Sequence, residues 1–223
     1  MPCQCNRNSL FEQSEQFSVD RVFATGRVKL YAPMLQWKTE LEQFCRFMIE
    51  RSVRTFLEIG TGDGQLSIFL KDALSLDRVC ACDLKLPPLL ARREDISFYH
   101  GDHQAPGYLD WRARQGLIDM VFIDANHQTG FRPDYEIERQ FPHRFIAFHD
   151  VANKAYPALR AFWENEVVGK KATFVNRDPA IGFGVPELTY PFKWVESAEE
   201  LEFDCGRSCG IGVSWRADSL GRE

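Results

Sequence analysis

The chain has 223 residues, with 27 lysines and arginines against 32 aspartates and glutamates, so its formal net charge is −5. This length suits one large domain, or a domain with an arm, and lets the chain bury a core without disulfide or metal staples. A hydrophobic fraction of 44% and a charged fraction of 26% exclude wholesale disorder. The acidic balance argues against a general affinity for nucleic-acid phosphates.

Two kinds of apolar segment are not found in the sequence. No apolar stretch approaches the roughly 20 residues that a membrane-spanning helix needs. The first 20 residues lack the basic and then apolar layout of a signal peptide. The sequence therefore predicts a cytoplasmic protein that makes no membrane contact.

The seven cysteines fall into two groups. Cys45, Cys80 and Cys82 lie in apolar runs and are predicted to be buried thiols. The other four lie near the two ends of the chain: Cys3, Cys5, Cys205 and Cys209. Their spacing does not match the paired CxxC knuckles of zinc sites, so we predict no structural zinc.

The chain opens with a polar stretch, residues 1–33, that we interpret as an irregular arm or lid. Apolar residues then recur at steps of three or four over residues 34–51, which predicts a helix with one buried face. The apolar run at 54–59, the glycine-rich turn at 60–64 and the helical spacing over 66–74 predict a strand, a turn and a helix. This is the first unit of an α/β fold.

The alternation of strand and helix continues along the chain. Further strands are predicted at 78–83, 96–100, 117–124 and 144–149, and further helices at 86–92, 109–115, 133–141 and 151–168. Residues 172–176 and 181–185 are predicted to be two strands that a turn at Asp178 and Pro179 joins into an antiparallel edge.

Successive strand–helix units require a mainly parallel sheet, because each helix crosses over to start the next parallel strand. The predicted fold class is therefore α/β, a doubly wound and mainly parallel seven-stranded sheet with an antiparallel edge strand. We expect this domain to span residues 34–186, between the arm at 1–33 and a C-terminal extension at 187–223 to which we assign no role. Such sheets bind ligands beyond the carboxyl ends of their strands.

A glycine-rich turn follows the first predicted strand and consists of Glu58, Gly60, Thr61, Gly62 and Gly64 with their neighbours. Glycine permits positive φ and lets a ligand approach the backbone. The spacing is GxGxG, whereas dinucleotide-binding turns have GxGxxG around a pyrophosphate. A carboxylate just before the turn repels pyrophosphate and attracts an ammonium group, so the turn predicts a site for a ligand with a cationic part.

Acidic residues also end the next two strands. Asp83 ends the second strand, where a carboxylate can accept hydrogen bonds from a ribose diol. Asp102 follows Gly101 after the third strand and could accept a hydrogen bond from an adenine amino group. Together with the glycine turn, these positions predict a cofactor that contains a nucleoside.

These motifs resemble those of the class I S-adenosylmethionine-dependent methyltransferases over about residues 34 to 186. The resemblance implies that the turn from Glu58 to Gly64 holds the methionine part of S-adenosyl-L-methionine. It implies that Asp83 holds the ribose, and that Gly101 and Asp102 hold the adenine.

Two later segments resemble the signature of small-molecule O-methyltransferases of the catechol and antibiotic-sugar type, which carry a divalent metal. They are Val-Phe-Ile-Asp-Ala-Asn-His, ending at His127, and Ala-Phe-His-Asp, ending at Asp150. The resemblance implies that Asp124 and Asp150 bind the metal, that Asp124 also borders the cofactor, and that His127 is the base. His149 stands where the family has a carboxylate or carboxamide. Oxygen ligands suit Mg²⁺, whereas a histidine ligand shifts the preference towards Mn²⁺, Fe²⁺ or Zn²⁺.

Methyl transfer to a hydroxyl needs that hydroxyl to lose its proton, which a divalent cation and a nearby base both favour. Asp124, His127 and His149 are therefore the candidate catalytic residues, and a small molecule with a hydroxyl is the expected methyl acceptor. By the same resemblance, Tyr31 and Gln36 lie where the family often builds a lid over the cofactor.

Several alternatives remain open. The site could work without a metal, with histidine alone as acid and base, or could methylate nitrogen, or the chain could be an inactive methyltransferase-like scaffold. A nucleic-acid acceptor is not expected, because there is no basic belt and no Asn/Asp-Pro-Pro-Tyr/Phe motif. A homo-oligomer is compatible with the sequence, which does not determine the oligomeric state.

Overall fold

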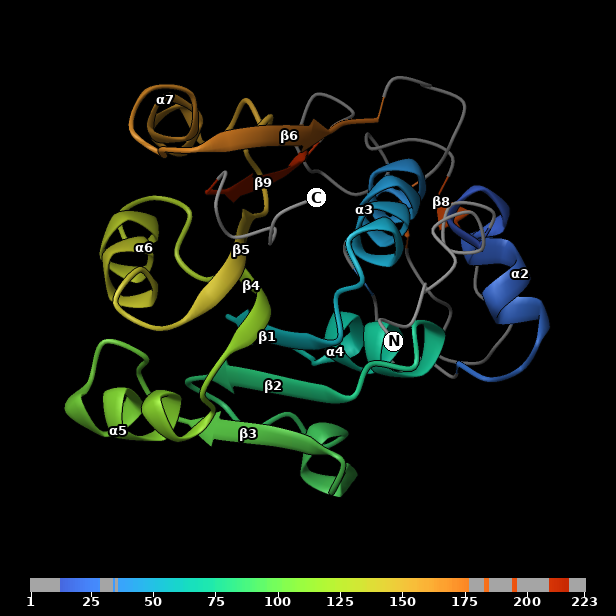
Figure 1. Ribbon diagram of the computed structural model, residues 1–223, viewed down its shortest axis with the longest axis horizontal. Coiled ribbons are helices and arrows are strands. Elements are labelled where there is room, and N and C mark those ends of the chain that lie inside the picture. The colour runs from blue at the N-terminus through green and yellow to red at the C-terminus, as the bar shows by residue number, and fades with distance from the viewer. Residues whose placement is uncertain are drawn as a thin grey trace, which may run out of the picture.

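The computed structural model describes residues 13–28, 34, 36–176 and 209–216, and the backbone of 183–184 and 194–195. A seven-stranded sheet in the order β3-β2-β1-β4-β5-β9-β6 forms its centre (Figure 1). Its strands are β1 (Thr55–Ile59), β2 (Arg78–Asp83), β3 (Ile96–His100), β4 (Ile118–Ile123), β5 (His143–Phe148), β6 (Lys170–Phe174) and β9 (Ile211–Trp215).

The five strands β1 to β5 are parallel to their neighbours, whereas β9 runs antiparallel to both β5 and β6. This confirms the predicted doubly wound, mainly parallel sheet of seven strands with an antiparallel strand towards one edge. Because β1 to β5 run in the same direction, their carboxyl ends all lie on the same side of the sheet, which we call its carboxyl edge. The acidic residues that end or follow these strands therefore gather along that edge.

The strand pairing beyond β5 differs from the prediction. β6 pairs with β9, and the described part of 181–185, Phe183 and Gly184, does not join it. β7 (Phe183–Gly184) pairs instead with β8 (Trp194–Val195) in a separate two-stranded sheet. The predicted antiparallel pair of 172–176 with 181–185 is therefore wrong. A short apolar run indicates that a segment is extended, but its partner depends on contacts far along the chain.

β9 comes from residues 187–223, for which the sequence indicated no structure. Its side chains Ile211 and Val213 are fully buried, so part of this extension belongs to the core of the sheet. The division of the chain at residues 33 and 186 stays a prediction.

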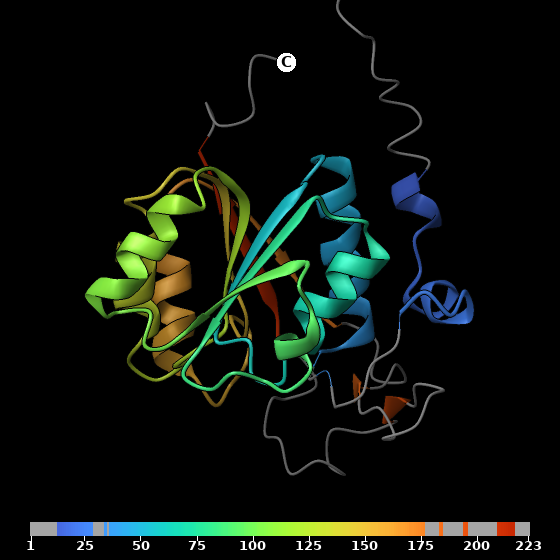
Figure 2. The ribbon, with the colours of Figure 1, turned by 90° about the horizontal axis from the view of Figure 1, so that it is seen from below.

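Helices cover both faces of the sheet (Figure 2). On one face lie α3 (Lys38–Glu50) and α4 (Gln65–Ala73), and on the other lie α5 (Pro106–Arg114), α6 (Phe131–Glu138) and α7 (Pro157–Asn165). A short 3-10 helix, η1 (Leu90–Arg92), precedes β3. None of the helices in the described part of the chain is long and apolar enough to cross a membrane.

The apolar side chains form two core clusters, one on each face of the sheet. On the first face, the ring of Phe44 on α3 lies 5.5 Å from that of Phe122 on β4. On the second face, the ring of Phe162 on α7 lies 5.8 Å from that of Phe148 on β5. Because β4 is buried on both faces, it is apolar at almost every position, as is typical of a central parallel strand.

The arm contains a helix that the sequence did not indicate, α2 (Val19–Ala24), which lies beside α3 (Figure 1). Val19 and Phe23 are buried, and the ring of Phe23 lies 5.6 Å from that of Phe69 on α4. With only six residues, α2 is too short to show a clear helical period.

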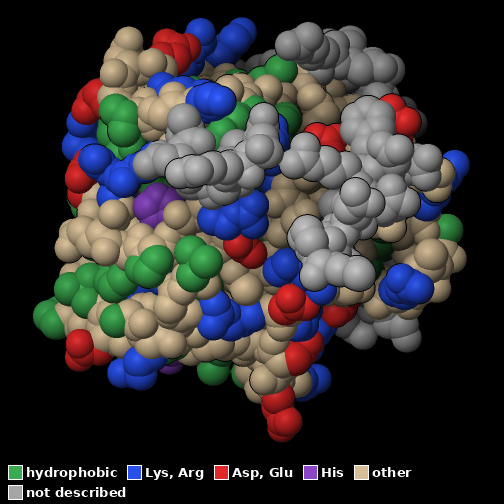
Figure 3. Space-filling view, in the orientation of Figure 1, with side chains coloured by type: hydrophobic (Ala, Val, Ile, Leu, Met, Phe, Trp, Pro, Cys, Tyr) green, Lys and Arg blue, Asp and Glu red, His purple; other side chains and the backbone are tan. Residues whose placement is uncertain are grey.

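Acidic and basic side chains are interspersed over the described part of the face in Figure 3.

A fully buried ion pair joins α5 to α6. The Nε atom of Arg112 lies 2.8 Å from Glu138 Oε2, and the hydroxyl of Tyr108 donates a hydrogen bond of 2.5 Å to Glu138 Oε1. Arg112 also donates hydrogen bonds to the carbonyl oxygens of Gly116 and Pro142. These hydrogen bonds and the attraction between Arg112 and Glu138 offset the cost of removing the two charges from water.

Replacing one partner of this pair should be far more destabilising than breaking a surface pair. Arg112→Met should lower the free energy of unfolding by about 3–5 kcal/mol, because it leaves the Glu138 carboxylate buried without its counter-charge. Arg160→Met is the control, since Arg160 and Glu164 form an exposed pair, and the change should be under about 1 kcal/mol. Urea unfolding measures the free energy of unfolding of both variants. Similar decreases in the two would contradict the assigned role of the buried pair.

Candidate functional site

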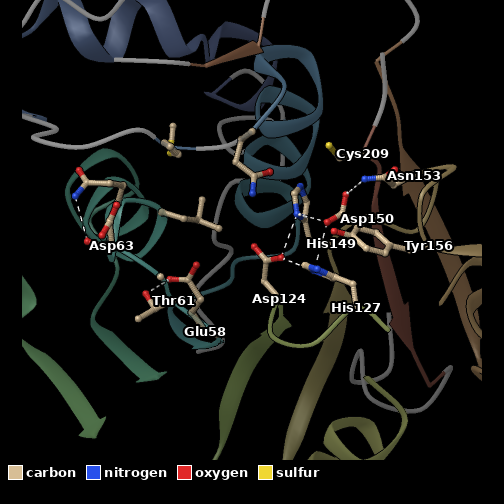
Figure 4. A pocket seen from close by; sticks show the side chains of 16 residues that line it. Glu58, Thr61, Asp63, Asp124, His127, His149, Asp150, Asn153, Tyr156 and Cys209 are labelled. Carbon is tan, nitrogen blue, oxygen red and sulfur yellow. Dashed lines mark hydrogen bonds and ion pairs between the residues drawn. The ribbon is translucent and has the colours of Figure 1, made fainter. Parts of the chain in front are cut away.

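Two neighbouring cavities lie at the carboxyl edge of the sheet. The first has a volume of about 380 Å³ and the second of about 600 Å³, and Gly60, Gly62 and Asp124 line both. Glu58, Thr61 and the candidate reaction centre line the first cavity (Figure 4). The residues predicted to hold ribose and adenine line the second: Asp83, Gly101 and Asp102. All the predicted site residues except Gly64 thus line this pair of cavities.

The three glycines of the turn all have positive φ, but for different reasons. A Cβ atom on Gly60 would lie 2.5 Å from the Cα atom of Ala125, and one on Gly64 would lie 2.5 Å from Leu90 Cγ. A Cβ atom on Gly62 would meet nothing within 4 Å. Packing of the protein itself therefore requires glycine at 60 and 64. Only Gly62 leaves open space, so the expectation that the glycines as a group make room for a ligand is too broad.

Glu58 is almost fully buried at the end of β1. Its Oε2 atom accepts hydrogen bonds from the hydroxyls of Thr61, at 2.7 Å, and Ser67, at 2.5 Å. Burial raises the pKa of Glu58 to about 8, although the two hydroxyl donors oppose that shift. A cationic group bound in the first cavity would favour the ionised carboxylate.

Asp83 reaches from the end of β2 towards the glycine turn. Its Oδ2 atom accepts a hydrogen bond of 2.9 Å from the backbone N–H of Gly62, and its Oδ1 atom accepts one of 3.0 Å from that of Lys85. Asp102 is exposed, and its Oδ1 atom accepts a hydrogen bond from the backbone N–H of Gln104. Asp83 therefore shapes the turn as well as bordering the second cavity.

The structure brings the four predicted reaction-centre residues together, from the ends of two adjacent strands (Figure 4). Asp124 follows β4 and His149 follows β5. His127 Nε2 lies 2.9 Å from Asp124 Oδ1 and 3.3 Å from Asp150 Oδ2. His149 Nδ1 lies 3.1 Å from Asp124 Oδ1 and 3.4 Å from Asp150 Oδ2. Each carboxylate thus contacts both imidazoles.

The backbone at Asp150 is in the left-handed region, with φ of 62°. This conformation costs a residue other than glycine about 1–2 kcal/mol. The side-chain amide of Asn153 donates a hydrogen bond of 2.7 Å to Asp150 Oδ1, and the backbone N–H of Asn153 donates one to the Asp150 carbonyl. Asn153, three residues further along the chain, therefore stabilises the strained conformation of Asp150.

Opposite charges dominate the protonation of the centre. Burial by itself would raise the pKa of Asp124 and of Asp150, but the two histidines outweigh it and lower both pKa values. Burial would likewise lower the pKa of His149, but Asp124 and Asp150 raise that pKa well above its usual value. The centre therefore favours ionised carboxylates beside a protonated His149.

The same four side chains fit a divalent metal ion. Their ligand atoms all lie within 4.8 Å of one another. Ligands about 2.1 Å from a metal lie about 3.0–3.4 Å apart in octahedral or tetrahedral sites, and the four contacts above span 2.9–3.4 Å. His149 Nε2 is buried without a hydrogen-bond partner. Two carboxylates with two imidazoles suit Mn²⁺, Fe²⁺ or Zn²⁺ better than Mg²⁺.

The composition of this group goes beyond the sequence prediction. The resemblance assigned Asp124, His149 and Asp150 to the metal and His127 only to the base, whereas the structure places His127 among the possible ligands. The group therefore has four members where the sequence indicated three.

Three further residues of the first cavity had no signal in the motifs: Asn153, Tyr156 and Cys209. The ring of Tyr156 lies 4.9 Å from that of His127. Asn153 and Tyr156 closely follow Asp150 in the chain, so inspection of that flank could have found them. Cys209 reaches the cavity through the unforeseen strand β9, and no local pattern indicates it.

Gln36 also lines the first cavity, and its buried Oε1 atom has no hydrogen-bond partner. Tyr31 lies outside the described residues, as do Cys3, Cys5 and Cys205. The absence of a zinc site at the terminal cysteines therefore stays a prediction.

No protein-family model and no curated protein matches this chain. Among solved structures, it is similar to the O-methyltransferase from Bacillus cereus in complex with SAH, with 15% identity, a TM-score of 0.54, and coverage of 93% of this chain and 90% of that one. The O-methyltransferase TomG from Streptomyces achromogenes, involved in tomaymycin synthesis and in complex with SAM, has 12% identity, a TM-score of 0.54, and coverage of 93% and 89%.

A putative caffeoyl-CoA O-methyltransferase from Staphylococcus aureus has 13% identity, a TM-score of 0.53, and coverage of 95% and 99%. At these identities the likeness shows the fold. The chain has the Rossmann-like fold of the class I S-adenosylmethionine-dependent methyltransferases, as the motifs predicted.

The raised pKa of Glu58 should make stability depend on pH. The folded protein keeps the Glu58 proton up to about pH 8, whereas the unfolded chain releases it near the usual glutamate pKa of 4.5. The free energy of unfolding should therefore fall as pH rises between these values, by at most about 1.4 kcal/mol per unit from this group. Glu58→Gln, which keeps an acceptor for both hydroxyls, should lack that component. Urea unfolding at several pH values measures the difference, and parallel pH profiles would contradict the assigned shift.

Proposed function

We propose that this protein transfers the methyl group of S-adenosyl-L-methionine to a hydroxyl of a small molecule, with the help of a divalent metal. The observation that carries the proposal is that Asp124, His127, His149 and Asp150 share one cavity with the turn that begins at Glu58. A cofactor-binding turn and a group able to activate a hydroxyl then face the same space.

In this proposal the cofactor spans both cavities. Glu58 and Thr61 would border its methionine part, with the Glu58 carboxylate ionised by the nearby ammonium group. Gly62 leaves open space for the ligand against the backbone. Asp83 would accept hydrogen bonds from the ribose hydroxyls, and Asp102 one from the adenine amino group.

The acceptor hydroxyl would lie in the first cavity beside the two histidines. Asp124, His149 and Asp150 would hold the metal, which when bound lowers the pKa of a hydroxyl and orients it. His127 would take the hydroxyl proton at Nδ1, the ring nitrogen opposite the one that contacts Asp124, as the base. Asp124 holds the ring of His127 in place through the contact at 2.9 Å and would stabilise its protonated form.

Three features support this reading over other uses of the fold, which does not by itself determine function. The similar solved structures include O-methyltransferases with SAH or SAM bound. The donor set of two carboxylates and two imidazoles fits a divalent ion. The acidic net charge of −5 favours a small-molecule acceptor over nucleic acid. A cytoplasmic location is proposed with it.

A metal-free enzyme is the second candidate, and one observation favours it. Without any ion, the four side chains already pair with one another, because both imidazoles contact Asp124 Oδ1. A histidine oriented by a carboxylate can act as a general base without a metal. Removal of divalent ions separates the two candidates.

The cofactor assignment predicts binding of S-adenosylhomocysteine with an affinity in the micromolar range, about −8 kcal/mol, and no comparable binding of NAD. Asp83→Ala should weaken binding by about 1–3 kcal/mol, because the ribose hydroxyls lose a charged acceptor. Gly62→Val should abolish it by filling the open side of the turn. Asp110→Ala, an exposed change on α5 away from both cavities, is the control. Calorimetry measures all four proteins, and full affinity in Gly62→Val would refute the assigned cavity.

The metal assignment predicts that Mn²⁺ raises the stability of the protein and that EDTA removes the gain. At a free concentration 100 times the dissociation constant, the gain should be about 2.7 kcal/mol. Asp124→Asn should lose it, whereas Asp63→Asn should keep it, because Asp63 lines the same cavity outside the four-residue group. Thermal unfolding with and without Mn²⁺ measures the effect.

The role of His127 is tested in the same preparation. His127→Ala should keep Mn²⁺ binding and lower the turnover of labelled S-adenosylmethionine with a panel of hydroxyl compounds by about 10²–10⁴-fold. If Mn²⁺ binding is lost instead, His127 is a ligand and not the base. If EDTA leaves the turnover of the parent protein untouched, the metal-free candidate replaces the metal-assisted one.

A further inference from the structure

Glu40 carries a carboxylate in the first turn of α3, yet its exposed fraction is zero. Its Oε1 atom accepts a hydrogen bond of 2.8 Å from the backbone N–H of Asn176, just beyond β6. Its Oε2 atom accepts one of 3.0 Å from the backbone N–H of Gly210, just before β9. Acidic residues at this helical position commonly serve the N-terminus of their own helix. Glu40 ties α3 to the end of β6 and to the start of β9, two neighbouring strands of the sheet.

Gly210 connects this carboxylate to the loop that follows β5. Its carbonyl oxygen accepts a hydrogen bond of 3.2 Å from the backbone N–H of Val151, and the carbonyl of Cys209 accepts one of 2.8 Å from that of Ala152. A Cβ atom on Gly210 would lie 2.6 Å from the Cβ atom of Ala152, so the two segments are in close contact. A continuous series of hydrogen bonds therefore runs from α3 through the start of β9 to the loop beside the reaction centre.

The residue before Val151 is Asp150, whose left-handed backbone points its carboxylate at both histidines. A residue keeps such a conformation only where the surrounding structure holds it. Asn153 holds the loop from the following side. The pair Cys209 and Gly210 holds it from the neighbouring strand.

We propose that Glu40 is a positioning residue for the reaction centre, and that it keeps Asp150 in place through Gly210 and Val151. The inference rests on the proposed function, because that function gives the position of Asp150 its chemical role. Glu40 lines neither of the two cavities. Its loss should therefore affect the metal site and leave the affinity for S-adenosylhomocysteine within about twofold.

Asp119 provides a matched control for the general cost of losing a buried carboxylate. It is 8% exposed, and its Oδ2 atom accepts hydrogen bonds from the backbone N–H groups of Arg54, at 2.8 Å, and Thr55, at 3.0 Å. Like Glu40, it thus ties two chain segments together. It does so near the amino end of β4, whereas the site lies at the carboxyl ends of the strands.

The experiment compares the full chain with its Glu40→Gln and Asp119→Asn variants in two measurements. Hydrogen exchange at the amides of Val151 and Ala152 reports the loop without any metal. Calorimetry with Mn²⁺ reports the centre. Both variants should be less stable than the parent. In Glu40→Gln alone, the two amides should exchange at least about tenfold faster, and the Mn²⁺ affinity should fall about 10–100-fold.

Unchanged exchange at Val151 and Ala152 in a folded Glu40→Gln protein would overturn the proposal, as would equal changes in Asp119→Asn. A parent protein that binds no Mn²⁺ would refute the metal-assisted function, while the exchange measurement still decides the role of Glu40. If Glu40→Gln does not fold, Glu40→Asp keeps the charge but draws the carboxylate back from the N–H of Gly210. It should show the same faster exchange at Val151 and Ala152, and normal exchange there would also overturn the proposal.

Discussion

The parallel direction of β1, β2, β4 and β5 is the constraint on which the rest of the site depends. Parallel strands place their carboxyl ends at one edge, and the right-handed crossovers leave that edge free of covering helices. Glu58, Asp83, Asp124 and His149 are distant in sequence and meet only for this reason. No one of these residues makes a site alone, because each lies in a different strand–helix unit.

Four charged or ionisable groups in one small space would repel or desolvate one another unless their signs alternate. The structure meets this requirement with two carboxylates and two imidazoles, each carboxylate in contact with both rings. This balance explains why the pKa values of Asp124 and Asp150 fall in spite of burial. It also means that any bound cation must compete with the proton on His149. The two carboxylates can therefore be neutralised either by protonated histidine or by a metal ion.

The first five strands and the residues at their ends were predictable from sequence because their signals are local. An apolar run that ends in glycine or an acid marks both the strand and the end of it that borders the cavities, as at Glu58 and Asp124. Strand β9 was not predictable, because its pairing with β5 joins Phe148 to Gly212 across a long intervening segment. The reason for glycine at position 60 was likewise hidden, since the atom that a side chain would strike belongs to Ala125, in the loop that follows β4.

The place of β9 between β5 and β6 has a consequence for the order of folding. Both of its neighbours precede it in the chain, so on the ribosome they are synthesised before the strand that joins them. Until then β5 presents an open, hydrogen-bonding edge, the kind of surface on which other chains add strands. The wall of the first cavity at Cys209 also forms only then. A nascent chain would therefore form the glycine turn at 60–64 early and the complete wall of the first cavity last.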